Sequence, residues 1–145
     1  MRQPEENGSQ GYQIRHLKKF ERTYELLIKS HYRRDRKSRE EFEDLISNFI
    51  EELGNSECPE ELGQKEPFPN KAAQNDLDLR KKRWRKLPGL QGAARYGRLI
   101  FLVNKKLKIV YLMWIYTYAE YQEPKSRPPD KELMQELINI NNWEE

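Results

Sequence analysis

The sequence predicts a two-layer α+β domain, in which an N-terminal helical hairpin packs against a small antiparallel β-sheet and a short helix ends the chain. Apolar residues recur twice at helical spacing in the first part of the chain, and β-branched and aromatic runs of strand length follow between positions 98 and 118. Turn residues separate these segments, which gives the order β-α-α-β-β-β-α. We expect a single domain over residues 11–145, after a polar segment, residues 1–10, that we expect to be disordered.

Two one-sided apolar stripes predict the helical hairpin, after a short alternating stretch at residues 12–17 that fits a strand. The first stripe comprises Phe20, Tyr24, Leu27, Ile28 and His31, and the second comprises Phe42, Leu45, Ile46, Phe49, Ile50 and Leu53. Ser38 and Glu41 match a capping box at the start of the second helix, and Gly54 matches its end. Because His31 closes an apolar face, a packed or helix-terminal histidine is favoured over a catalytic one.

Three strands are predicted in the second half of the chain, at residues 79–87, 98–103 and 108–118, with turns at Pro88-Gly89 and at residues 104–106. Alternation in the last strand places Trp114, Tyr116 and Tyr118 on one face and Ile109, Met113 and Ile115 on the other. We expect the second set to be core. The first set is either an exposed aromatic platform for bases, or, for Trp114 and Tyr116, part of the packing beneath the C-terminal helix.

A long loop and a terminal helix complete the prediction. Residues 54–78 are rich in Pro, Gly, Asn and Glu and show no lasting period, so we expect a mobile loop. Pro128-Pro129-Asp130 is a good helix start with Asp130 as the cap. The helix that follows carries the narrow apolar stripe of Leu133, Met134, Leu137 and Ile138.

The charges are unevenly distributed along the chain, although the formal net charge is only +3. Residues 40–66 contain ten acidic residues and one basic residue, whereas residues 71–98 contain nine basic residues and two acidic residues. The basic segment is either solvated surface or a binding patch for an anionic partner. The single cysteine, Cys58, excludes an internal disulfide and a cysteine-rich zinc site. No apolar run is long enough for a membrane span or a signal peptide, so we expect a cytoplasmic protein.

The basic segment interleaves aromatic side chains with cations, a pattern used to stack unpaired bases beside their phosphates. The candidate RNA-binding residues are Arg83, Trp84, Arg85, Lys86, Arg95 and Tyr96. Trp84 has an equally good alternative as an anchor of its strand to the core. In that case Arg83 and Arg85 face away from the core, which favours phosphate binding.

Several segments together resemble the RelE/ParE superfamily of bacterial toxins from type II toxin–antitoxin systems. These segments are "HYRRDRKSREEFEDLI", "LPGLQGAARYGRLIFLV", "IYTYAEY" and "RPPDKEL", and the resemblance extends over residues 12–140. Within them, "GAARYGRLIFLV" resembles the "G-x-x-R-x-x-Y" strand of that family. The resemblance implies a messenger-RNA endonuclease that works without a metal or other cofactor, often on the ribosome, and that an antitoxin wraps and holds inactive. One branch of the family poisons DNA gyrase instead.

Metal-free RNA cleavage requires a base near the attacking 2′-hydroxyl, an acid near the leaving oxygen, and cations on the phosphate. Arginine suits the last task, and Arg83, Arg85, Arg95 and Arg98 are candidates. The family places its acid/base group at the end of the last strand, so the resemblance assigns that task to Tyr118, Glu120 or Tyr121. Neither His16 nor His31 is close to this end in the sequence, and we expect no imidazole there.

These observations predict a RelE-like endoribonuclease, an mRNA interferase, with Arg98, Tyr118, Glu120 and Tyr121 as its catalytic residues and no metal. The expected partners are a cognate antitoxin, in a toxin–antitoxin hetero-oligomer, and messenger RNA; no membrane is expected. Two alternatives remain: a catalytically inactive module of the same fold that binds RNA or protein, and a ParE-like toxin directed at gyrase.

Overall fold

The computed structural model describes residues 11–69, 76–121 and 127–144, and it has the predicted α+β architecture and element order. The predicted disordered segment, residues 1–10, lies outside the described residues. The strands are β1 (Gln13–His16), β2 (Gln64–Lys65), β3 (Leu77–Trp84), β4 (Gly97–Asn104) and β5 (Ile109–Thr117). The helices are α2 (Lys18–His31), α3 (Arg36–Asn55) and α4 (Asp130–Glu144), with short 3₁₀ turns η1 (Pro59–Leu62) and η3 (Gly92–Arg95).

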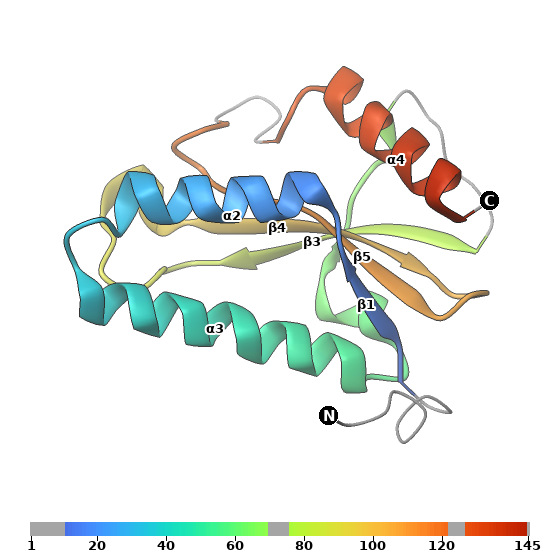
Figure 1. Cartoon of the computed structure of the whole chain (residues 1–145), viewed down its shortest axis with the longest axis horizontal. Helices are drawn as coiled ribbons and strands as arrows, with labels where there is room; N and C mark the ends of the chain where they lie inside the picture. Colours follow the sequence, from blue (N-terminus) through green and yellow to red (C-terminus); the bar gives the residue numbers. More distant parts are fainter. Residues whose placement is uncertain (1–10, 70–75, 122–126, 145) are drawn as a thin grey trace.

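The strands form one sheet with the order β1-β5-β4-β3-β2. Adjacent strands are antiparallel, except that β1 pairs in parallel with the first half of β5. The α2–α3 hairpin lies against one face of the sheet, as expected, and its two helices run antiparallel to each other (Figure 1). The opposite face is covered by α4. β4 and β5 are therefore enclosed on both sides.

The hairpin face is held by an aromatic cluster. Phe42 is fully buried on α3, and its ring stacks on Tyr24 and Tyr32, with centroid distances of 5.6 and 4.9 Å. About two turns further along α3, Phe49 makes edge contacts with Phe101 of β4 and Trp84 of β3. Burial of these large rings supplies much of the apolar area that keeps the hairpin on the sheet.

A bulge in β5 changes which side chains face α4. The pairing of β4 with β5 shifts between Ile100 and Phe101, and Met113 and Trp114 then both lie on the α4 face. The predicted alternation is therefore wrong in part: Ile109 and Met113 pack beneath α4, whereas Ile115 faces the hairpin. The prediction of an exposed aromatic platform is also wrong for Trp114 and Tyr116. Both side chains are only 3% exposed and pack beneath α4, which is the alternative that the sequence left open for them.

Two local predictions need correction. Asp35, not Ser38, caps α3: its carboxylate accepts a hydrogen bond from the Ser38 amide at 3.0 Å, and the helix continues past Gly54 to Asn55. The expected mobile loop is wrong for residues 59–66, which form η1 and then β2 at the sheet edge. Residues 70–75 of that loop are not described. None of the described helices is both long and apolar enough to cross a membrane.

Replacing Phe42 with alanine should lower the free energy of unfolding by about 3–5 kcal/mol, because the cavity removes contacts to both neighbouring rings. Leu107→Ala is the matched control, since Leu107 is 48% exposed on the β4–β5 turn, and it should change stability by about 0.5 kcal/mol or less. Urea unfolding measures both. Equal losses in the two variants would contradict this account of the core.

Candidate functional site

The turn after β5 fixes a carboxylate at the end of the sheet. The chain reverses between Thr117 and Glu120, where the Glu120 amide donates to the Thr117 carbonyl at 3.0 Å. The Glu120 carboxylate in turn accepts the Thr117 amide at 2.7 Å and lies 3.0 Å from its hydroxyl. The hydroxyl also accepts the Ala119 amide at 3.1 Å. The predicted catalytic carboxylate is therefore held by its own turn.

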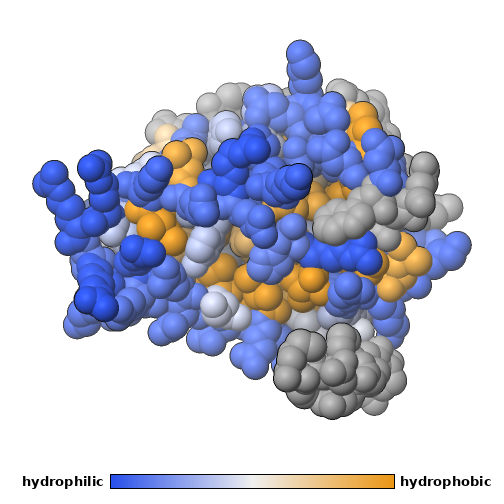
Figure 2. Space-filling model, viewed as in Figure 1, coloured by the Kyte–Doolittle hydropathy of each residue, from blue (hydrophilic) through white to orange (hydrophobic). Residues whose placement is uncertain are grey.

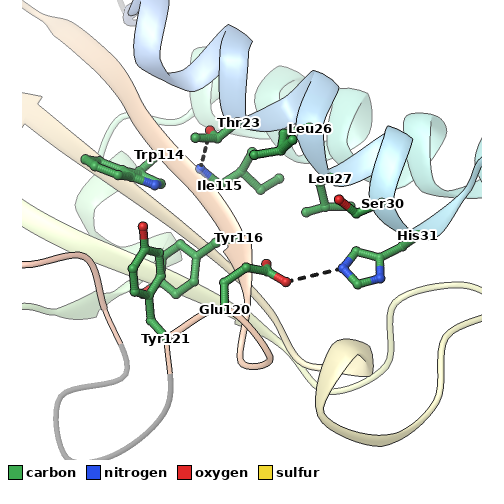
Figure 3. A pocket seen from close by; sticks show the side chains of 10 residues that line it. All are labelled: Thr23, Leu26, Leu27, Ser30, His31, Trp114, Ile115, Tyr116, Glu120 and Tyr121. Atoms are coloured by element: carbon green, nitrogen blue, oxygen red, sulfur yellow. Dashed lines mark hydrogen bonds and ion pairs between the residues drawn. The ribbon is translucent and has the colours of Figure 1, made fainter.

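The structure brings a histidine to this carboxylate. His31 is the last residue of α2, and its Nε2 atom lies 3.3 Å from Glu120 Oε2 (Figure 3). The side chains are 19% and 39% exposed, so the pair is sheltered but open to solvent. The expectation that no imidazole lies near the strand end is wrong. The helix-terminal interpretation of His31 is confirmed, but its partner, 89 positions away, could be found only from the way α2 lies along β5.

A small pocket of about 90 Å³ opens beside the His31–Glu120 pair, between α2 and β5. Its walls are Thr23, Leu26, Leu27, Ser30, Trp114, Ile115, Tyr116 and Tyr121 (Figure 3). The Thr23 hydroxyl accepts the Ile115 amide at 3.2 Å, which ties α2 to the part of β5 that β1 does not cover. The pocket is thus aromatic and aliphatic, with the acid/base pair at one side.

Tyr121 packs over the pocket as an aromatic cover. Its ring makes edge contacts with Tyr116 at 5.3 Å and with Trp114 at 6.5 Å between centroids. Burial, with the charges of Glu132 and Glu120, raises the pKa of Tyr121, so its hydroxyl stays protonated at neutral pH. Tyr121 can therefore donate a hydrogen bond but is a poor base.

Four predicted residues meet where β4 begins and β5 ends. The Tyr118 amide donates to the Tyr96 carbonyl at 3.0 Å, and the two rings make an edge contact at 6.3 Å. The Arg98 guanidinium lies 6.0 and 5.9 Å from the centroids of these rings. Arg95 lies 4.3 Å over the Tyr96 ring and donates to its hydroxyl. Cations bound to tyrosine faces in this way could hold a phosphate beside an aromatic surface.

The other predicted RNA-binding residues are spread over two faces. Arg83 is exposed and pairs with Arg98 across β3 and β4. Trp84 points to the hairpin face, where its ring meets Phe49 at 5.5 Å, and this favours its role as an anchor. Arg85 and Lys86 follow the strand on the surface, where Lys86 Nζ donates to the Leu90 carbonyl at 2.7 Å. Only Arg83 therefore shares the face of Arg98.

A buried ionic cluster, which the sequence did not reveal, fastens the start of α4 to the sheet. Glu66 lies 3.4 Å from Lys81 of β3 and 3.0 Å from Arg127, and Arg127 also bonds Asp130 at 2.8 Å. Burial lowers the pKa of Lys81, and the Glu66 charge acts in the opposite direction. Burial raises the pKa of Tyr116 nearby, and the Glu66 charge adds to that rise. These contacts are structural and are not part of the acid/base pair.

Comparisons of the chain with protein-family models, with curated proteins and with solved structures found no match. Among residues 11–69, 76–121 and 127–144, no group of three or more His, Cys, Asp or Glu side chains is placed to hold a metal ion. The functional assignment consequently depends on the site itself.

Glu66→Gln should lower the free energy of unfolding by about 3–5 kcal/mol, because it leaves two buried cations without their shared carboxylate. Glu40→Gln is the control, since Glu40 pairs with Arg36 on the surface, and its effect should stay within about 1 kcal/mol. Urea unfolding compares them. If Glu66→Gln lowers the free energy of unfolding no more than Glu40→Gln does, the cluster contributes little to anchoring α4.

Proposed function

We propose that this protein is a metal-independent endoribonuclease similar to the RelE toxins, which would inhibit translation by cutting messenger RNA. The observation that carries the proposal is the His31–Glu120 pair, 3.3 Å apart and fixed in the turn after β5, where the Tyr118 ring lies 5.9 Å from the Arg98 guanidinium. This arrangement supports the three requirements of the reaction: a proton acceptor, a proton donor and cations for the phosphate.

The imidazole is the proposed general base. With its Nε2–H donated to Glu120, the lone pair of neutral His31 is on Nδ1, which can take the proton of the 2′-hydroxyl. Glu120 then stabilises the imidazolium that forms. Because Thr117 holds the carboxylate through its amide and hydroxyl, the pair needs little reorganisation during the reaction.

The cations and tyrosines are proposed to act on the phosphate. The 2′-oxygen attacks phosphorus, the bond from phosphorus to the 5′-oxygen breaks, and Arg95 and Arg98 neutralise the charge that develops. Tyr118 donates its proton to the departing 5′-oxygen and recovers one from solvent. The products are a 2′,3′-cyclic phosphate and a 5′-hydroxyl, and His31 releases to solvent the proton that it took from the 2′-hydroxyl, which balances the proton that Tyr118 recovers.

The biological setting is proposed from the sequence resemblance. A nuclease of this kind would act in the cytoplasm and would be held inactive by a cognate antitoxin until needed. The acid/base pair is 19% and 39% exposed, which leaves it accessible both to RNA and to such an inhibitor.

Purified protein incubated with messenger RNA in the presence of EDTA should cleave it, with or without translating ribosomes, and leave 2′,3′-cyclic phosphate ends. Mapping of the new ends checks both the reaction and its independence from metals. Intact RNA under both conditions would favour the binding module or the gyrase-directed toxin.

His31→Gln and Glu120→Gln should each lower the cleavage rate by roughly 10²–10⁴-fold, because each removes half of the acid/base pair. The combined change Arg98→Gln with Glu120→Gln should abolish cleavage without unfolding the domain.

The matched control is His16→Gln, since His16 is an exposed histidine at the end of β1 and contacts Phe20. Its cleavage rate should equal that of the parent protein, since His16 lies outside the site. A full rate in the Arg98/Glu120 double variant, or an equal loss of rate in His16→Gln and His31→Gln, would overturn the site assignment.

A further inference from the structure

Six exposed cations from two distant segments lie at one end of the molecule. We call this surface the cationic end: Arg33, Arg34, Arg36 and Lys37 from the α2–α3 turn and the start of α3, with Arg85 and Lys86 from the connection after β3. Figure 2 shows long hydrophilic side chains projecting from the end where the α2–α3 turn lies in Figure 1. The same two segments contain one carboxylate, Asp35.

The two segments are fixed against each other. The Tyr32 hydroxyl, on a side chain that is buried at the end of the hairpin, donates to the Pro88 carbonyl at 2.8 Å. Gly89 has a φ of +73°, and a Cβ atom there would come within 2.3 Å of Ser38 Oγ, in the first turn of α3. The connection between β3 and β4 is thus seated directly on the α3 N-terminus, and the cations share a defined scaffold.

Little of this positive charge is neutralised within the protein. Asp35 is engaged as the cap of α3, and the Arg36–Glu40 pair is 90% and 61% exposed, so solvent screens it strongly. Within the described part of the chain, Arg33, Arg34, Lys37 and Arg85 have no ion-pair partner. The cations therefore remain available to an external anion.

The charge pattern of α3 opposes the helix dipole. Cations near the N-terminus of a helix and anions near its C-terminus destabilise the helix through its dipole. Nevertheless, α3 has no acidic residue in its first turn and no basic residue in its last turn. Arg36 and Lys37 begin the helix, and Glu51 and Glu52 lie near its end. Helix α2 also begins with two cations, Lys18 and Lys19, but Glu21 follows in its first turn, and Lys29 and His31 lie in its last turn. Helix α3 therefore lacks the compensating charges that α2 has in its first and last turns, and such an uncompensated arrangement is typical of charge retained for binding.

We infer that the cationic end binds the phosphate backbone of double-helical RNA, as a second contact surface outside the proposed cleavage site. Long, exposed arginine and lysine side chains suit phosphates, whereas base stacking needs exposed rings. The aromatic residues in these segments, Tyr32 and Trp84, are engaged with Phe42 and Phe49. The choice of RNA rests on the proposed function, and the surface begins two residues after His31, so one folded RNA can reach both.

The test is binding of a fluorescein-labelled RNA duplex of about 20 base pairs, followed by anisotropy from 50 to 300 mM KCl. The variant is Arg33→Gln, Arg34→Gln and Lys37→Gln together. Its affinity at 100 mM KCl should fall about tenfold or more, and the slope of log K against log[KCl] should become shallower by about 2–3, close to 0.9 for each lost phosphate contact. Lys105→Gln with Lys106→Gln, on the β4–β5 turn at the other end of the sheet, removes two surface charges, one of them paired with Asp78, and should bind as the parent does.

All binding measurements use a Glu120→Gln background, so that cleavage does not enter them. If the proposed nuclease is wrong, RNA cleavage by the parent is absent while the salt-dependent duplex binding persists. If the cationic end is wrong, the triple variant and the Lys105/Lys106 control bind alike, or both parent and variant prefer vesicles that contain phosphatidylserine over the RNA.

Thermal unfolding of the triple variant separates a binding role from a folding role. Because Lys37→Gln removes a cation from the positive end of the α3 dipole, its melting temperature should be unchanged or raised. A lowered melting temperature together with weaker RNA binding would overturn the proposal, since the charges would then serve the fold.

Discussion

The structure depends on burial of the central strands on both faces. Every residue of β5 is buried, and in β4 only the last residue is not. Strands of this kind must be covered twice, by the α2–α3 hairpin on one side and by α4 on the other. Polar side chains of a functional site can therefore reach solvent only at the ends of β4 and β5, beyond the helices that cover them. Both the His31–Glu120 pair and the Arg98–Tyr118 contact lie there.

The geometry of the site follows from how α2 is docked. β1 pairs with only the first half of β5, and beyond it the Thr23 hydroxyl accepts the Ile115 amide that a further strand would otherwise bond. The helix therefore runs beside the uncovered edge of β5 and ends with His31 against the turn that holds Glu120. The His31–Glu120 contact thus joins two elements that are distant in sequence and whose positions the core determines.

The sequence predicted what depends on local periodicity, and it missed what depends on pairing. The stripes of the hairpin and the apolar runs of β4 and β5 are local patterns, so they predict these elements nearly in full. The Met113 bulge is invisible to strict alternation, which is why Ile109 and Met113 lie on the α4 face and not with Ile115 on the hairpin face. Ser38 and Asp35 are both good caps, and only the structure shows which one accepts the amide. The helical stripe predicts only that His31 ends its own helix, whereas its partner, Glu120, lies 89 positions further along the chain.

The central claim is that RNA is bound and cut at the end of β5. It is tested most directly by nuclear magnetic resonance of the isotopically labelled protein titrated with a short 2′-O-methyl RNA, which cannot be cleaved. The account predicts that the largest shifts fall on the His31 ring and on the backbone amides of Thr117, Tyr118 and Glu120, which form the site. If the RNA shifts signals elsewhere in the protein but leaves those of His31, Thr117, Tyr118 and Glu120 unchanged, the proposed site is wrong.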